Sequence, residues 1–294
     1  MLRHPWYDGA LYVLIICVFP GCVILSSSRI DPPEPHRGAH YYSSLTAKLL
    51  GSDTSKTLDY RLIDPAIYKG IVQENTLTHP IVDPAKAQRL KASSVEIIVD
   101  DQTIQSDLQW IRDSSIVDSV EFQIYLYFDT STGLISSAHG QPGTDSSSSP
   151  EYYYESKTGV AHPFVDSVRL NWILIGQVHG HPDRKDPSQT TAHHMSPADS
   201  ITAHCLQIPV YAIDAMDNQL GSSEKMHRIV PNTTSSPADD ETHIGSTRGK
   251  GFAAKDTINL GLQALWIWGK SRLIDTVCLN KNQYKGRPIW VTHP

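Results

Sequence analysis

The residues of this sequence best suited to chemistry are two histidines separated by one residue, His179 and His181, with Ser196 and Asp199 downstream. An apolar run over residues 168–178 comes before the histidines and predicts a strand that ends at them. Because alternate side chains of a strand project from one face, both imidazoles can reach one ion at the usual zinc–nitrogen distance of about 2 Å. This spacing predicts a zinc site at a strand end.

Asp199 is the predicted third ligand, and water takes the fourth position, as in open zinc sites. It lies one turn into a helix that the sequence predicts from Ser196 to about residue 206, so the start of this helix can fold back over the strand end. Ser196, at the N-cap, is expected to hydrogen-bond the oxyanion that forms on a substrate carbonyl. The Ser-Pro-Ala-Asp tetrapeptide alone is weak support, since residues 236–239 repeat it with no histidine pair before them.

Hydrolysis at such a site also needs a general base that lies near the ion without binding it, a role that suits Glu. Glu121, at the start of a strand predicted over residues 121–128, is the first candidate, and Glu96, in a strand predicted over residues 95–99, is the second. The alternative interpretation of the histidine pair is a structural polar cluster without a metal.

The order of these residues resembles the pattern of the JAMM (MPN-type) zinc metalloprotease superfamily, and in particular its bacterial JAB-like branch. The matching stretches are Glu121, then His179-Gly180-His181-Pro182, then Ser196-Pro197-Ala198-Asp199. The resemblance covers about residues 121–215. It implies a deaminase-like α/β sandwich, a zinc ion held by the two histidines and the aspartate, and hydrolysis of an amide or isopeptide bond in which Glu121 and Ser196 are catalytic.

Strand and helix patterns alternate around these residues and predict an α/β (α+β) domain over residues 95–294, with a mixed sheet flanked by helices. Residues 41–94 lack a strong period and are predicted to be an accessory segment with two short helical pieces. The expected elements are further strands at 209–213 and 226–230, a hairpin turn at 129–133, helical pieces at 44–50 and 84–90, and a helix at 256–268 that Gly269 ends.

The N-terminus is predicted to direct the protein out of the cytoplasm. Residues 10–25 are apolar and uncharged, and a Pro-rich linker over residues 29–40 follows them. Three forms stay open: a lipoprotein signal with lipid on Cys22, a signal peptide cleaved after residues 26–28, or an uncleaved anchor. All three predict a location in the cell envelope or outside the cell. Whether Cys205 and Cys278 form a disulfide also stays open.

The bulk composition excludes some classes of function. The 294 residues carry a net charge of -6 with His neutral, which argues against a nucleic-acid surface. The function that the sequence favours is a zinc-dependent hydrolase of peptide, isopeptide or related amide bonds, for example in a cell-wall peptide. The alternative is a non-catalytic envelope protein that serves as an interaction module. A deaminase of small molecules is a third hypothesis, against which the missing Cys ligands argue.

Overall fold

The computed structural model describes residues 38–73, 80–140, 142–143, 152–154, 161–163, 171–182, 195–214, 226–231 and 252–270 of the chain. The strands are β1 (Ala39–Ser43), β2 (Leu49–Ser52), β3 (Asp59–Ile63), β4 (Val95–Glu96), β5 (Ile98–Val99), β6 (Gln123–Asp129), β7 (Leu134–His139), β8 (Tyr152–Tyr154), β9 (Ala161–Pro163), β10 (Trp172–His181), β11 (Val210–Asp214) and β12 (Met226–Ile229). The helices are α1 (Pro65–Val72), α2 (Pro84–Ala92), α3 (Asp101–Asp118), α4 (Pro197–Leu206) and α5 (Ala254–Lys270).

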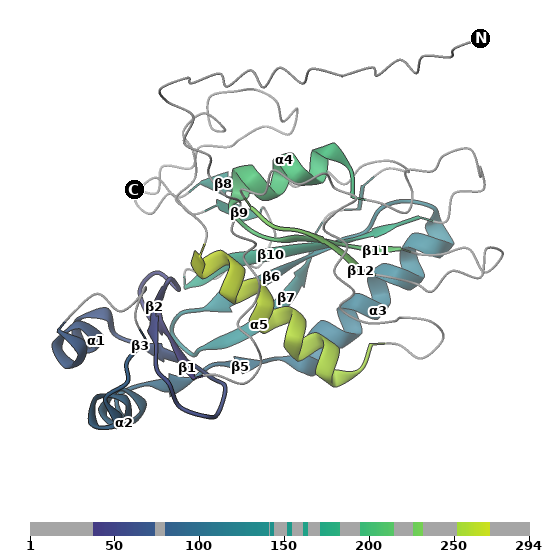
Figure 1. Cartoon of the computed structure of the whole chain (residues 1–294). Helices are drawn as coiled ribbons and strands as arrows, with labels where there is room; N and C mark the ends of the chain where they lie inside the picture. Colours follow the sequence, from purple (N-terminus) through teal and green to yellow (C-terminus); the bar gives the residue numbers. More distant parts are fainter. Residues whose placement is uncertain are drawn as a thin grey trace, which may run out of the picture.

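Most of these strands form two mixed sheets. The larger has six strands in the order β12-β11-β10-β6-β7-β5, and the smaller has four in the order β2-β1-β3-β4, while β8 and β9 form a separate pair. In the larger sheet β10 runs antiparallel to β6 and parallel to β11, with α4 in the connection between β10 and β11. The protein is therefore a mixed α/β structure with helices against its sheets, which confirms the predicted class at this level (Figure 1).

The helices α3, α4 and α5 divide between the two faces of the six-stranded sheet. The methyl group of Ala212 on β11 lies in one apolar cluster with Ala203 of α4, so α4 covers this face. Gly176 and Gly180 of β10 face the other way, toward Ala264 of α5 and Ser115 of α3. The main core fills the space between the sheet and α3 and α5, and it contains mostly aliphatic and aromatic side chains.

The segment before residue 95 contributes three strands of the smaller sheet and two helices, and β4 adds the fourth strand. α2 begins as the sequence predicts, because Asp83 accepts hydrogen bonds from Ala85 N and Lys86 N and Pro84 takes the first turn. The helical piece predicted at 44–50 is wrong. Residues 44–46 form a turn, and β2 follows it and pairs with β1. The Ser43 hydroxyl accepts hydrogen bonds from the amides of residues 45 and 46, which stabilises the turn.

Two other element boundaries differ from the sequence prediction. The strand expected at 95–99 is divided at Ile97, with β4 in the smaller sheet and β5 at the edge of the larger one. α5 continues through Gly269 to Lys270 instead of ending at the glycine. A Cβ at Gly269 would lie 3.0 Å from the Tyr42 ring and 3.1 Å from Leu49 N, so this glycine allows α5 to approach the smaller sheet closely.

The helix α3 is absent from the elements expected from the sequence, although it is 18 residues long. Its buried stripe consists of Ile104, Leu108, Ile111 and Ser115, at helical spacing. Most of its other residues are polar, and the stripe ends in a serine, so the apolar period is weak. The stripe and the Asp100 N-cap, which accepts a hydrogen bond from Thr103 N, are the signals that predict this helix.

Several predictions fall on residues that the structure does not describe. These are the apolar segment 10–25, most of the linker 29–40, and Cys278, so the signal and disulfide hypotheses stay predictions. Within the described ranges, no helix combines the length and the apolar character that crossing a membrane requires.

Candidate metal centre

Three side chains from β10 and α4 converge at the end of β10. His179 Nε2 lies 3.2 Å from His181 Nε2 and 3.6 Å from Asp199 Oδ1. One ligand atom from each of the three residues lies within 4.8 Å of the others. Two ligands bound at about 2.0–2.1 Å to a tetrahedral ion are roughly 3.3 Å apart. The 3.2 Å between the two Nε2 atoms and the 3.6 Å between His179 Nε2 and Asp199 Oδ1 are close to this separation, so they fit zinc geometry. Both histidines are buried, and the Asp199 side chain is 17% exposed.

The histidine pair projects toward α4 because the residue between them faces α3. A Cβ at Gly180 would lie 2.5 Å from Ser115 Oγ and 2.6 Å from Ile111 Cγ2, so only glycine fits against α3 here. Alternation along β10 then places His179 and His181 on the opposite face. The glycine between the histidines therefore has a structural cause, namely the close approach of α3.

Ser115 also ties together the two strands that carry the candidate residues. Its hydroxyl accepts a hydrogen bond from Phe122 N at 3.3 Å and donates one to Gly180 O at 3.4 Å. Ser115 is fully buried, and Phe122 and Gly180 adjoin Glu121 and His181 in the sequence. A single side chain of α3 thus fixes the start of β6 relative to the end of β10, on the face of the sheet opposite α4.

Asp199 is held by the capping box that starts α4. Its Oδ2 atom accepts hydrogen bonds from Ser196 N at 2.7 Å and from Ser196 Oγ at 2.8 Å, while its amide donates to Ser196 Oγ at 3.3 Å. Oδ1 remains directed at His179. One carboxylate oxygen therefore anchors the helix start and the other faces the histidines. In this arrangement the Ser196 hydroxyl supports the predicted ligand, and its role at an oxyanion stays a prediction.

Glu121 lies just before β6 and is 8% exposed. His179 is paired with Gln123 on β6, and Gly180 N donates to Phe122 O at 2.9 Å. The paired residues of β6 and β10 end at Gln123 and His179, so Glu121 lies two residues beyond the last pair. Its carboxylate is outside the group of three side chains whose ligand atoms lie within 4.8 Å of one another. The backbone of Glu121 is also fixed by Gly143 N, which donates to Glu121 O at 2.7 Å.

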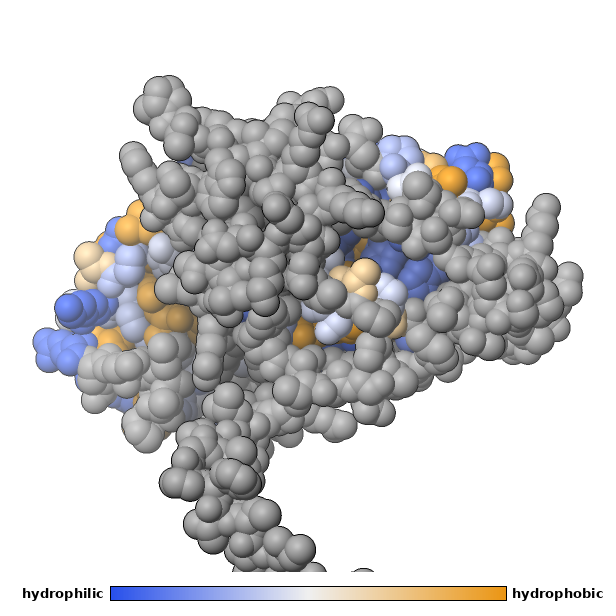
Figure 2. Space-filling view, turned by 90° about the horizontal axis from the view of Figure 1, so that it is seen from above, coloured by the Kyte–Doolittle hydropathy of each residue, from blue (hydrophilic) through white to orange (hydrophobic). Residues whose placement is uncertain are grey.

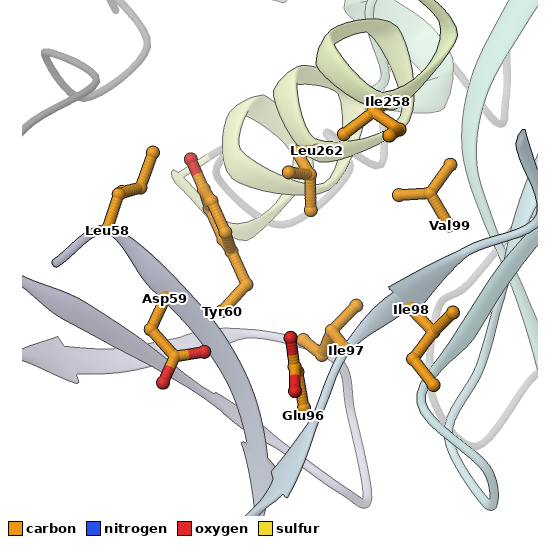
Figure 3. Close-up of a pocket in the computed structure, with 9 residues that line it drawn as sticks. All are labelled: Leu58, Asp59, Tyr60, Glu96, Ile97, Ile98, Val99, Ile258 and Leu262. Carbon is orange, nitrogen blue, oxygen red and sulfur yellow. The ribbon is translucent and has the colours of Figure 1, made fainter. Parts of the chain in front are cut away.

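Glu96, the second candidate base, belongs to a different part of the molecule. It lies in β4 of the smaller sheet, opposite Arg61, next to the edge strand β5. Since β5 is three strands from β10, with about 4.8 Å between neighbours, the structure does not bring Glu96 to the histidines. It lines a separate cavity of about 320 Å³ with Tyr60 and Leu262, among other residues, between the smaller sheet and α5 (Figure 3).

No protein-family model matches this sequence, and no curated protein matches it either. The chemistry of the site therefore follows from its own residues and their geometry.

The surroundings of the three residues are only partly described. His193, His194 and the repeated tetrapeptide at 236–239 lie outside the described residues. Seen from above, on the side where α4 lies in Figure 1, the described residues in view form separate patches that contain both hydrophilic and hydrophobic residues (Figure 2). The described site is a buried pair of imidazoles with one anchored carboxylate, a set of donors typical of a metal centre with an open position.

Proposed function

We propose that this protein is a zinc-dependent hydrolase that acts on peptide, isopeptide or related amide bonds outside the cytoplasm. The observation that supports it most is the convergence of His179, His181 and Asp199 within 4.8 Å. Two neutral imidazoles and one carboxylate are ligands that zinc accepts, and three protein ligands leave one position for water or substrate. In this proposal His179, His181 and Asp199 hold the ion, and Glu121 and Ser196 act on the substrate.

A zinc ion held by these residues would polarise the substrate carbonyl and lower the pKa of a water to about 7. Glu121 takes the proton of the attacking water as the C–O bond forms. It then delivers this proton to the leaving nitrogen as the C–N bond breaks. The Ser196 hydroxyl donates to Asp199 Oδ2 in this structure, and in the reaction it turns to donate to the carbonyl oxygen, on which negative charge develops, and so lowers the barrier. Asp199 Oδ2 then keeps the hydrogen bond from Ser196 N.

The proposal includes a deaminase-like sandwich of the JAMM type, in its JAB-like branch. Its support is the order of Glu121, the histidine pair and Asp199, together with the β10-α4-β11 unit that carries the last three. The apolar segment at 10–25 supports a location in the envelope or outside the cell, with a peptide such as a cell-wall peptide as substrate.

The test is hydrolysis of a panel of fluorogenic peptides and Lys-linked isopeptides by the zinc-loaded protein and by Glu121→Gln. We expect the variant to keep one zinc per chain and to lose at least about 100-fold in kcat, since a general base contributes about 10²–10⁴-fold. A Glu96→Gln control is expected to keep wild-type kcat. A zinc-loaded wild type that cleaves nothing in the panel would favour the non-catalytic module instead, and Glu121→Gln with full activity would remove Glu121 from the mechanism.

A further inference from the structure

Two polar atoms beside the proposed metal centre are buried without hydrogen bonds. His179 is 2% exposed, and its Nδ1 atom has no partner within the described part of the chain. Gln177 is also 2% exposed, and its Oε1 atom likewise has no hydrogen-bond partner within the described residues. A buried polar atom without a hydrogen bond destabilises the folded state, so two such atoms at neighbouring positions of one strand face need a physical explanation.

The side chain of Gln177 is directed toward Gln123, the cross-strand partner of His179. Gln177 and His179 are two apart on β10 and project from the same face. Gln177 Nε2 donates to Gln123 Oε1 at 2.8 Å, and Gln123 is the residue opposite His179 on β6. On the other side of His179 the opposite residue is Ala212, whose methyl group offers no acceptor. Gln177 Oε1 is therefore a buried acceptor without a hydrogen bond in the described part of the chain, on the same strand face as the His179 ring and two residues from it.

We propose that Gln177 is a positioning residue that holds His179 in the tautomer with its proton on Nδ1. Gln177 Oε1 accepts this N–H through one bridging water, while Gln123 Oε1 accepts from the Nε2 atom of the same amide. The Nε2 atom of His179 then keeps a free lone pair, and Nε2 is the atom that faces His181 Nε2 at 3.2 Å and Asp199 Oδ1 at 3.6 Å.

This role has a consequence for metal affinity. A histidine that binds a metal usually donates its other ring N–H to an acceptor, and loss of that acceptor lowers metal affinity by about 10–100-fold. The consequence rests on the proposed function, whereas the tautomer is a property of the protein without metal. The two statements are therefore tested separately.

The first experiment records long-range ¹H–¹⁵N correlations of the histidine rings in the metal-free full chain, well above the ordinary His pKa of about 6.5. His179→Ala assigns the His179 signals by their loss. We expect the wild type and Gln177→Glu, which keeps an acceptor, to show the Nδ1–H tautomer. We expect Gln177→Leu to lose this preference. A wild-type His179 with its proton on Nε2, or an unchanged tautomer in folded Gln177→Leu, would overturn the proposal.

The second experiment measures zinc affinity by competition with a chromophoric chelator. Gln177→Leu should bind zinc about 10–100-fold more weakly than the wild type. The matched control is Gln263→Leu on α5, whose side chain accepts from Tyr211 on the far face of the sheet and which should bind as the wild type does. Equal affinities of Gln177→Leu and the wild type would contradict the inference. Wild-type zinc binding by His179→Ala would instead contradict the proposed metal centre. If Gln177→Leu does not fold, the wild-type and Gln177→Glu tautomers decide.

Discussion

The two oxygens of Asp199 have separable tasks, and this distinction leads to the first prediction. Oδ2 accepts two hydrogen bonds from Ser196, and Oδ1 faces His179 at 3.6 Å. Asp199→Asn keeps an oxygen for the cap and loses the anionic ligand. Sharing the roughly 10–16 kcal/mol of a zinc site among four ligands gives about 2.5–4 kcal/mol for each, so we expect zinc affinity to fall about 100-fold or more.

The measurement for Asp199→Asn is zinc titration beside thermal unfolding of the metal-free protein. The metal-free variant should melt close to the wild type, because the cap is kept. A variant that binds zinc normally but melts much earlier would show that Asp199 has only a capping role.

Ser196→Ala tests the other half of the capping box. Asp199 Oδ2 keeps the hydrogen bond from the backbone N–H of residue 196, so we expect zinc binding to change little. The metal-free protein should lose about 1 kcal/mol from the missing cap. In the proposed reaction kcat falls by about 10²–10³, as for the loss of one oxyanion donor. Denaturant unfolding and kinetics on one cleaved peptide check both values, and an unchanged kcat would exclude Ser196 from the chemistry.

At the scale of elements, α3 determines how β6 and β10 present the candidate residues. A Cβ at Gly180 would meet three atoms of α3: Ser115 Oγ at 2.5 Å, Ile111 Cγ2 at 2.6 Å and Ile111 O at 3.2 Å. Gly180→Ala must therefore displace α3, and we expect a loss of about 1–3 kcal/mol in the free energy of unfolding together with weaker zinc binding.

The matched control for Gly180→Ala is Gly70→Ala in α1, where a Cβ meets nothing within 4 Å. Alanine in a helix should stabilise the protein there by about 0.5–1 kcal/mol. Denaturant unfolding and zinc titration of both variants are the measurements. A Gly180→Ala variant as stable as the wild type, with normal zinc affinity, would contradict the role assigned to α3.

The smaller sheet predicts a dependence of stability on pH through Asp53. Burial alone raises the pKa of Asp53, but hydrogen bonds from Ala39 N, Ser55 and Tyr41 outweigh it and hold this pKa below its usual value. A lowered folded-state pKa stabilises the protein above the unfolded value of about 3.9, and this contribution is lost as the pH falls through the folded-state value.

Asp53→Asn should therefore lower the free energy of unfolding by about 1.5–3 kcal/mol at pH 7, the range for hydrogen bonds to a charged group. The difference between the variant and the wild type should shrink as the pH falls below about 4. Urea unfolding over a pH series measures it. A difference that stays constant down to about pH 2, below the usual carboxyl range, would show that the charge of Asp53 does not contribute.

What the sequence could predict at this scale follows from the range of the interactions. The His179 and His181 pair and the Ser196 cap depend on strand alternation and on contacts three residues apart, so local patterns predict them. β1 pairs with β3, whose residues lie 20 positions later in the sequence, from Ala39 with Asp59 to Ser43 with Ile63. The glycine at 269 lets α5 approach Tyr42 and Leu49, which lie more than 200 residues earlier. Such long-range causes leave no local period, which is why local patterns do not predict the smaller sheet or the end of α5.

At the scale of the whole molecule, the smaller sheet shares a core with the domain that carries the histidines. Tyr42 and Leu62 belong to the same buried cluster as Trp266 of α5, and the His40 ring lies 4.7 Å from the Trp266 ring. Leu62 also lies near Gly133, in the turn between β6 and β7. We therefore expect the two parts to unfold together.

Leu62→Ala tests this coupling. A buried Leu→Ala change costs about 2–5 kcal/mol. If the core is shared, hydrogen exchange should show lower protection in β10 as well as in β1. Exchange measured by mass spectrometry on peptides from both strands gives the answer, and faster exchange in β1 with unchanged β10 would mean that the smaller sheet unfolds on its own.

The most direct test of the metal centre is elemental analysis of the purified protein after dialysis against trace zinc, for the wild type, His179→Ala and His139→Ala. His139 is a suitable control because it is an exposed histidine that pairs with Asp107 on α3, away from the α4 face. We predict one zinc per chain in the wild type and in His139→Ala, and none in His179→Ala. A His179→Ala protein that retains one zinc per chain, or a folded wild type that binds none, would contradict the assignment of His179, His181 and Asp199 as a zinc site.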